Sequence, residues 1–167
     1  MTQIRKEVPA DAPAIEAVTI EAFRGAAHAS HTESCIVRAL RRSGRLTLSL
    51  VVEDEGSIIG HIAVSPVDVS DGSRAWYGLG PVSVVPARQR QGIGTLLVKH
   101  ALEQLRALGA AGCVVLGEPG YYGRFGFRTE PSLVLAGVPA GYFQAIAFRG
   151  PVPSAAVTYH DAFAATA

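Results

Sequence analysis

One segment, from Val82 to Thr95, constrains the fold most strongly, because it joins a strand end, a glycine-bearing turn and a helix start. Apolar residues then recur at helical spacing from Gly92 to Leu108, and Gly109 stands where a C-terminal glycine cap belongs. The all-apolar run Cys113 to Leu116 indicates a strand that is buried on both faces beside a parallel neighbour. This strand–loop–helix–strand unit predicts a mixed α/β domain.

Two helices are predicted before the main sheet. After a short strand over residues 2–7, Asp11 is placed to cap the first helix. The second helix begins at Ser30–Glu33, which has the pattern of a capping box, and ends at Gly44. The apolar positions expected to face the core are Ile15, Val18, Ala22, Phe23, Ile36, Val37 and Leu40.

An antiparallel meander follows these helices. The β-rich runs are Leu46–Glu53, Ser57–Val69 and Ala75–Val85, and Asp/Gly turns separate them. Gly78 and Gly80-Pro81 interrupt the third run. Glycine or proline inside a strand marks a bulge or a close approach of another backbone or a ligand.

The last part of the chain has weaker patterns. We expect strands at Leu133–Ala136 and Phe143–Phe148, followed by a tail rich in proline and glycine whose end, Ala162–Ala167, is loosely held. Repeats and linkers are absent from the sequence. We therefore expect one domain over residues 1–167.

The composition argues against several classes of partner. The chain has 167 residues, and 15 Lys and Arg against 14 Asp and Glu give a net charge of +1, so no overall field favours nucleic acid or an anionic membrane. Cys35 and Cys113 lack the spacing of metal ligands, and we expect buried thiols and no metal. Because no apolar run reaches the roughly 18 residues that span a bilayer, and no leader is apparent, we expect a cytoplasmic protein.

The glycine-bearing turn has the features of a phosphate site. Gly92 and Gly94 present no side chain to a ligand, and the first-turn N–H groups lie at the positive end of the helix dipole. Arg88 and Arg90 add local positive charge. A dinucleotide fingerprint would need a third glycine where Leu97 stands, and a Walker loop would need Gly-Lys-Ser/Thr. Both common alternatives therefore fit less well.

These residues resemble the GNAT superfamily of acetyl-CoA-dependent N-acetyltransferases. Its signature, Gln/Arg-x-x-Gly-x-Gly/Ala, stands here as Gln89–Gly94, after the strand end Val84–Pro86 and before Tyr122–Phe127. The resemblance covers residues 2–130, and residues 131–167 look like a subgroup extension. It implies a mostly antiparallel twisted sheet with a splayed parallel pair and helices on both faces.

The resemblance also implies a set of cofactor contacts. Backbone groups of the strand end should bind the acetyl and pantetheine parts of acetyl-CoA, and amides of the loop should hold its pyrophosphate. The pantetheine arm should enter where the two parallel strands splay. The implied residues are Val82, Ser83, Val84, Gln89, Arg90, Gln91, Gly92, Ile93, Gly94 and Thr95.

Direct acetyl transfer also needs a proton for the departing thiolate and a base for the incoming ammonium. The resemblance places the acid at Tyr122, with Tyr121 as its rival, although the stretch before it is shorter than is usual in the family. The strand after the long helix lacks the carboxylate that often serves as base. Glu118, Glu33 and His61 are the candidates for that role, and water is an alternative.

Other functions stay open at this stage. A module that senses coenzyme A or acetyl-CoA without turnover is the main alternative, and a nucleotide-binding domain is a third. The acceptor is an amine of a small molecule, a peptide or a protein, and the sequence does not identify it. Edge strands late in the chain would allow a homodimer.

Overall fold

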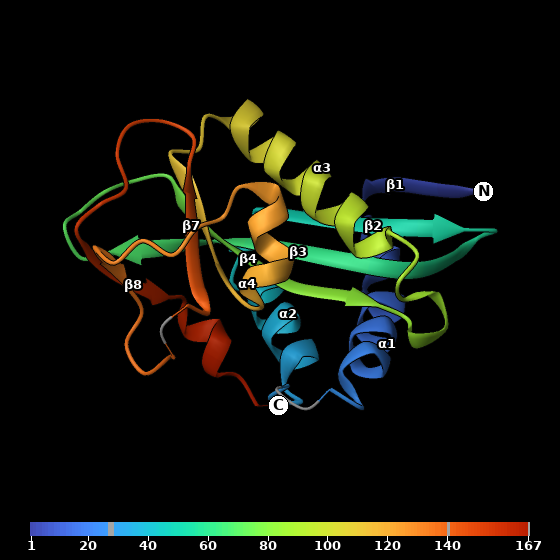
Figure 1. The fold of residues 1–167 in the computed structure, drawn as a ribbon. Helices are drawn as coiled ribbons and strands as arrows, with labels where there is room; N and C mark the ends of the chain where they lie inside the picture. The colour runs from blue at the N-terminus through green and yellow to red at the C-terminus, as the bar shows by residue number, and fades with distance from the viewer. Residues whose placement is uncertain (27–28, 140, 167) are drawn as a thin grey trace. The chain divides into compact units, whose positions relative to one another are not determined.

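The computed structural model describes residues 1–26, 29–139 and 141–166. By their contacts the residues form two compact units. The first unit comprises Met1–Val64, Gly80–Ala101 and Asp161–Ala167, and the second comprises Ser65–Leu79 and Leu102–His160. Strands β3 and β4 and helix α3 each contribute to both units, and Figure 1 traces the course of the chain through them.

The first unit contains an antiparallel sheet in the order β1-β2-β3-β4. Strand β1 pairs antiparallel with β2, and β2 pairs antiparallel with β3 with Ser49 opposite Ala63. The predicted meander is confirmed in these strands, and β3, the second of its three runs, begins and ends as expected. Their bounds are β1 Thr2–Lys6, β2 Leu48–Asp54, β3 Ser57–Val69 and β4 Trp76–Val84.

Helices cover both faces of the sheet in the first unit. On one face Ala63 packs with Ile15 and Val37, which come from helices α1 and α2. On the other face a Cβ added to Gly60 would lie 3.2 Å from Leu97 of α3. Because neighbouring residues of a strand point to opposite faces, α3 and the α1–α2 pair lie on opposite sides of β3, as Figure 1 also shows. The helices are α1 Ala12–Phe23, α2 Glu33–Arg42 and α3 Ile93–Leu108.

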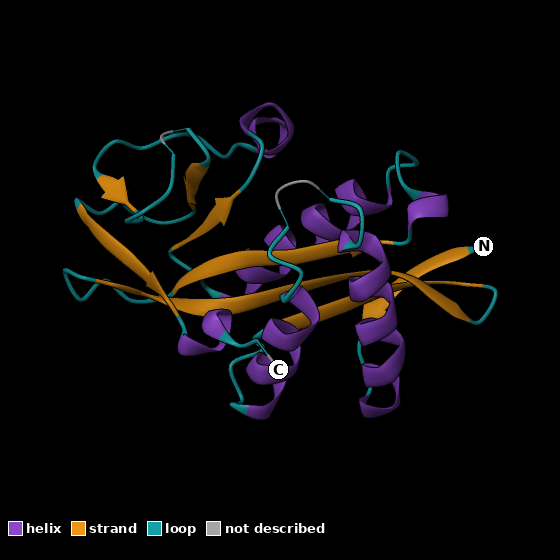
Figure 2. Ribbon diagram, turned by 90° about the horizontal axis from the view of Figure 1, so that it is seen from below, coloured by secondary structure: helices purple, strands orange, loops and turns teal. Residues whose placement is uncertain are grey.

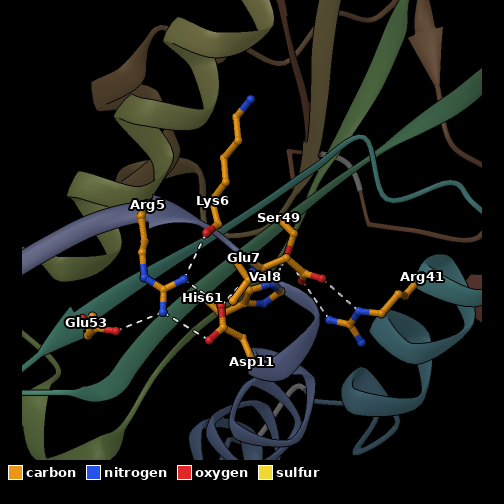
Figure 3. Close-up of polar contacts among 9 residues, drawn as sticks. All are labelled: Arg5, Lys6, Glu7, Val8, Asp11, Arg41, Ser49, Glu53 and His61. Atoms are coloured by element: carbon orange, nitrogen blue, oxygen red, sulfur yellow. Dashed lines mark hydrogen bonds and ion pairs between the residues drawn. The ribbon is translucent and has the colours of Figure 1, made fainter.

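The cap predicted at Asp11 is wrong. Helix α1 does begin after this residue, but the Asp11 side chain makes no capping hydrogen bond to the helix. Its carboxylate accepts hydrogen bonds from Arg5 at 2.7 and 3.1 Å and from the Val8 backbone N–H at 2.8 Å, as Figure 3 shows. Arg5 also donates to Glu53 at 2.9 Å. Instead of capping α1, the Asp11 carboxylate is therefore bound by the guanidinium of Arg5 in β1.

The start of α2 also differs from the expected capping box. Glu33 accepts hydrogen bonds from the backbone N–H and the hydroxyl of Ser30, but α2 begins at Glu33 itself, and the preceding Thr32 makes no side-chain capping hydrogen bond. Gly44 ends α2 with a positive φ of 72°. The tail expected to be loose is instead packed over Asp161–Ala164, where Ala162 is buried beside Leu40; residue 167 lies outside the described residues.

The second unit contains the parallel pair. Strand β4 runs parallel to β5 over three residue pairs, from Trp76 opposite Gly112 to Gly78 opposite Val114. Strand β7 pairs antiparallel with the other edge of β5 along its whole length. The mixed, mostly antiparallel sheet is therefore confirmed, whereas the splay of the parallel pair stays a prediction. The bounds are β5 Gly112–Leu116 and β7 Phe143–Ala147.

The sequence prediction missed one strand. Residues Ala155–Tyr159, assigned to an irregular tail, form β8, which pairs antiparallel with the end of β3. The short strand β6, Leu133–Val134, runs parallel to β8. A buried cluster that includes Trp76 and Val157 supports these strands. Figure 2 distinguishes the strands from the short helix α4, Pro119–Tyr122.

Candidate active site

The glycine-bearing loop of the first unit is held by its own side chains. The Gln89 side-chain amide donates a hydrogen bond to the Val84 carbonyl at 3.0 Å. Arg88 donates to Asp54 at 2.8 Å and to the side-chain oxygen of Gln91 at 3.1 Å. These contacts tie the loop to the end of β4 and to the β2–β3 turn. The Arg88 guanidinium is thus engaged by a carboxylate rather than directed only to a ligand.

The loop leads directly into the N-terminus of α3. Arg90 and Gly92 have positive φ angles of 63° and 83°, and the Leu96 N–H donates to the Gly92 carbonyl at 3.0 Å. The N–H groups of a first helical turn lack partners within the helix and favour anions. A Cβ on Gly92 would have no described atom outside its neighbours within 4 Å. Open space beside a helix N-terminus fits a phosphate group.

The end of β4 carries an unsatisfied polar group. Ser83 is 1 % exposed, and its hydroxyl has no hydrogen-bond partner among the described residues. Val82 and Val84, on either side of it, are half-buried. Leaving a buried hydroxyl unpaired costs about 1–3 kcal/mol. Because this hydroxyl is buried, the acetyl-CoA contact expected of Ser83 stays a prediction for its backbone groups.

Tyr122 lies at the end of α4 in the second unit. A Cβ added to Gly117 would be only 2.4 Å from the Tyr122 ring, so the ring lies directly against the backbone that follows β5. The ring also meets Phe127 edge-on with centroids 5.9 Å apart. Burial, and to a smaller extent Tyr121 and Cys113, raises the pKa of Tyr122 to about 12. The phenol is therefore neutral at physiological pH and can act as a hydrogen-bond donor.

Tyr121 occupies a different environment from Tyr122. Its ring meets Tyr122 and Phe125 edge-on with centroids 5.0 and 5.5 Å apart, and the Arg124 guanidinium lies 4.6 Å from its centroid. The atoms nearest to a Cβ placed on Gly117, at the end of β5, belong to the ring of Tyr122. This difference favours Tyr122 over Tyr121 as the acid, and the assignment stays a prediction.

The two carboxylate candidates for the base differ in their contacts. Glu118 is exposed, and its backbone carbonyl accepts hydrogen bonds from the N–H groups of Tyr121 and Tyr122 at 3.1 and 3.0 Å. Glu118 therefore lies at the start of α4, the short helix that ends at Tyr122. Glu33 accepts from Ser30 just before α2, and this structural contact accounts for that carboxylate. The role of Glu118 as the base stays a prediction.

His61 is part of a polar chain inside the first unit, shown in Figure 3. Its Nε2 lies 2.8 Å from the Ser49 hydroxyl, and that hydroxyl donates to Glu7. Glu7 in turn accepts two hydrogen bonds from Arg41, at 2.9 and 3.0 Å. Because the single hydroxyl proton of Ser49 goes to Glu7, Nε2 must donate to Ser49. In the neutral imidazole the proton is therefore on Nε2, and Nδ1 carries none.

Burial also keeps His61 out of reach of an amine substrate. The residue is 0 % exposed, and Nδ1 has no hydrogen-bond partner among the described residues. Burial lowers the pKa of His61 to about 4, although Glu7 acts in the opposite direction. A histidine that is inaccessible and only weakly basic is poorly suited to deprotonate an ammonium ion. The structure thus favours a structural role for His61.

For Gly78, inside β4, the sequence predicts a bulge or the close approach of another backbone or a ligand. The structure gives a different reason for a glycine at this position. A Cβ on Gly78 would be 2.6 Å from the Tyr159 ring and 3.2 Å from Val67. The glycine is therefore required by a protein side chain. Tyr159 belongs to β8, the strand that the sequence prediction missed. The sequence signal for this strand is the alternation of Val157 and Tyr159, which lie two positions apart.

The remaining sequence predictions concern metals, thiols and membranes. Cys113 is fully buried, and burial raises the pKa of its thiol, whereas Cys35 is half-buried. Within the described ranges, no cluster of three or more His, Cys, Asp or Glu residues is arranged to hold a metal ion. None of the helices in those ranges is both long and apolar enough to cross a membrane.

Comparison with known proteins identifies the family. A model of the acetyltransferase (GNAT) family matches residues 14–127. The chain belongs to this family. The uncharacterized N-acetyltransferase YhbS of Escherichia coli is 42% identical over 126 residues, which are 75% of this chain and 72% of YhbS. The GNAT match includes the loop at the start of α3 and the segment of Tyr122.

Two solved GNAT structures resemble this chain over nearly its full length. A GNAT family acetyltransferase from Brucella melitensis in complex with acetyl-CoA is 50% identical, covers 98% of both chains and has a TM-score of 0.88. Escherichia coli YhbS in complex with CoA is 36% identical, covers 98% of this chain and 92% of its own, and has a TM-score of 0.87. The expected fold class is thereby confirmed beyond the core, including residues 131–167.

Proposed function

We propose that this GNAT protein transfers the acetyl group of acetyl-CoA directly to a primary amine of a small molecule, a peptide or a protein. The observation that carries the proposal is the open, glycine-bearing loop at the N-terminus of α3, in a chain that is 50% identical to a protein solved with acetyl-CoA. We further propose that residues 1–167 act as one domain, in which the extension 131–167 supplies β7 and β8.

The loop and the end of β4 would divide the binding of acetyl-CoA between them. Backbone amides from Arg90 to Thr95, together with the Gln89 and Gln91 segment, would hold the pyrophosphate at the helix N-terminus. Backbone groups of Val82 and Val84 would orient the acetyl and pantetheine parts. Because the thioester would be held in one orientation, its reaction with a bound amine would be effectively unimolecular.

Tyr122 would act on the sulfur. As the nitrogen of the neutral amine forms its bond to the carbonyl carbon, the C–S bond breaks, and the proton that the nitrogen loses passes to the thiolate through water. With a pKa of about 12, Tyr122 is neutral and donates a hydrogen bond to the developing thiolate. Full transfer of its own proton to a thiolate of pKa near 8.5 would be uphill by about 5 kcal/mol. Stabilisation by hydrogen bonding is therefore its expected contribution.

Glu118 is the proposed base. It is exposed at the start of the helix that carries Tyr122, and a carboxylate there can accept the ammonium proton directly or through water. The Glu118→Gln variant should lower the rate of acetyl transfer most strongly at low pH, where more of the amine is protonated. An unchanged pH profile would leave water as the base.

Calorimetric titration with acetyl-CoA and coenzyme A tests the binding loop. Gly92→Asp and Gly92→Asn make the same demand on the positive φ of 83° and differ only in charge. We expect micromolar binding by the wild type, a moderate effect of Asn, and loss of binding with Asp. Equal binding by both variants would show that no phosphate lies at this loop.

Thiol release over a panel of amines distinguishes an enzyme from a sensor. The wild type should release coenzyme A in the presence of at least one primary amine, and Tyr122→Phe should lower kcat without weakening acetyl-CoA binding. Tight binding of acetyl-CoA without release for any amine would support the sensor alternative.

A further inference from the structure

The backbone of the loop before α3 is held in a conformation that needs support. Arg90, which is not a glycine, has a positive φ of 63°, and Gly92 follows at 83°. Contact between Cβ and the backbone disfavours such an angle for arginine, so it persists only where neighbouring contacts fix the chain. Both residues are exposed, so packing in the core does not fix them. The shape of the loop therefore depends on polar contacts of the side chains around it.

One of these contacts comes from a different strand. The Gln89 side chain binds the carbonyl of Val84, which belongs to the strand that leads into the loop. Arg88, by contrast, donates a hydrogen bond at 2.8 Å to Asp54, the last residue of β2, which is 34 positions away in the chain. Asp54 thus ties the loop to the β2–β3 turn, and all of these residues lie in the first unit.

Arg88 transmits this contact to the middle of the loop. Its Nη1 binds Asp54, while its Nε donates at 3.1 Å to the side-chain oxygen of Gln91, the residue before Gly92. Because the guanidinium is planar and rigid, a carboxylate that fixes one N–H group also fixes the direction of the others. The side chains of Arg88 and Asp54 are 30 % and 20 % exposed, so their ion pair is less screened than one at a fully exposed surface.

Asp54 also has a second cationic partner. The N-terminal ammonium of Met1 donates to Oδ1 at 2.9 Å, whereas Arg88 donates to Oδ2. The hydrogen bond from Arg88, and after it that from the N-terminus, lowers the pKa of Asp54, so the carboxylate is ionised at neutral pH. Only the contact with Arg88 leads into the loop, and a test has to separate the two partners.

We propose that Asp54 is a positioning residue for acetyl-CoA, which acts through Arg88 to hold the loop before α3 in the conformation that binds the pyrophosphate. This inference rests on the proposed binding of acetyl-CoA at the loop. Without the Asp54 carboxylate, the loop would adopt this conformation only part of the time. The apparent affinity for acetyl-CoA would then fall in proportion to the populated fraction.

The sign of the effect distinguishes positioning from a simple effect of charge. Acetyl-CoA is a polyanion, so removal of a nearby negative charge should by itself tighten its binding. Loss of a positioning contact should weaken it. We expect the acetyl-CoA Kd of Asp54→Asn to be about three- to tenfold higher than that of the wild type, which corresponds to a binding-competent population of about 10–30 %.

Glu55→Gln is the matched control for Asp54→Asn. Glu55 is the next residue of the same turn, it is exposed, and its carboxylate has no partner among the described residues. The substitution removes the same charge from nearly the same place without breaking the contact with Arg88. Its Kd for acetyl-CoA should therefore equal that of the wild type or be lower. A rise as large as that of Asp54→Asn would overturn the proposal.

Calorimetric titration with acetyl-CoA of the wild type, Asp54→Asn, Arg88→Gln and the double variant forms a double-mutant cycle. If Asp54 acts through Arg88, the double variant should bind as weakly as Arg88→Gln alone. A further weakening would instead place the effect on the N-terminal contact and overturn the proposal. With any amine that supports thiol release, Asp54→Asn should raise the KM for acetyl-CoA by the same factor as the Kd, while kcat at saturation should stay within about twofold.

The calorimetric result also separates this inference from the proposed function and from a folding defect. Equal or tighter binding by Asp54→Asn, in a wild type that binds acetyl-CoA, would overturn the role of Asp54 alone. A lower stoichiometry at an unchanged Kd would indicate partial unfolding and would also overturn it. If the wild type binds no acetyl-CoA, the proposed function fails, and this inference fails with it.

Discussion

The neutral state of His61 leads to a quantitative prediction about stability and pH. In the folded protein, protonation would place a cation at 0 % exposure with an unpartnered Nδ1–H. Burial accordingly lowers the pKa of His61 to about 4 from an ordinary 6.5. The unfolded chain therefore binds more protons than the folded chain between these two values. Stability from this residue is fully present above pH 6.5 and is lost as the pH falls toward 4.

The size of the effect follows from the shift. The difference of about 2.5 pKa units, at about 1.36 kcal/mol each, corresponds to about 3 kcal/mol of unfolding free energy. This is a large fraction of the stability of an ordinary domain. Glu7 acts in a different window. Burial alone would raise its pKa, but hydrogen bonds from Arg41 and Ser49 lower it, so its contribution is lost only below the ordinary value of 4.5.

Urea unfolding at several pH values between 7 and 4.5 measures the effect. The His61→Gln variant keeps a side-chain amide that can donate to Ser49 but cannot titrate. It should be less stable than the wild type at pH 7 and should lose about 2.5 kcal/mol less on acidification to pH 4.5, which is still above the folded pKa of about 4. Equal slopes for the wild type and His61→Gln would refute the assignment of a neutral, buried imidazole.

Three further substitutions test individual contacts. Gly60→Ala would place a Cβ 3.0 Å from a methyl group of α3 and should cost about 1–3 kcal/mol in urea unfolding; an unchanged midpoint would mean that the helix yields freely. Arg41→Ala leaves the half-buried Glu7 carboxylate without its two guanidinium hydrogen bonds, and should lower the unfolding free energy by about 1–3 kcal/mol at pH 7. The difference from the wild type should shrink as the pH falls through the lowered pKa of Glu7. Gly117→Ala should displace the Tyr122 ring and lower kcat about tenfold or more while calorimetry shows unchanged acetyl-CoA binding; an unaffected kcat would remove Tyr122 from the chemistry.

Features with short-range causes could be predicted from the sequence. The turn between β2 and β3 has Glu55 and Gly56 at φ angles of 49° and 81°, as an acidic residue followed by glycine between two β-rich runs indicates. The end of α3 at Gly109, with a φ of 85°, follows from the last apolar position of its helical period. The binding loop belongs to the same class, because its glycines and the helix start are adjacent in the chain.

The candidate active site could not be predicted from local sequence patterns alone. The N-terminus of α3 could be identified from the sequence. The choice between Tyr121 and Tyr122 could not, because it depends on which ring of α4 lies against Gly117, the residue that follows β5. Likewise, Asp11 carries the sequence signal of a cap, yet its carboxylate pairs with Arg5. The carboxylate binds this guanidinium of β1 and the Val8 N–H that precedes it, and leaves the first turn of α1 without a side-chain cap.

By itself, the sequence of this chain determined the helix periods, the turns and the glycine loop at the start of α3, because hydrophobic spacing and backbone preferences act over a few residues. Only the tertiary structure decided that β8 pairs with β3, that Tyr159 requires the glycine at position 78, and that His61 is buried without charge. Each of these depends on residues far apart in the chain. Their burial and pairing are defined only after the sheet has assembled, when water has been excluded and a polar atom must find its partner within the fold.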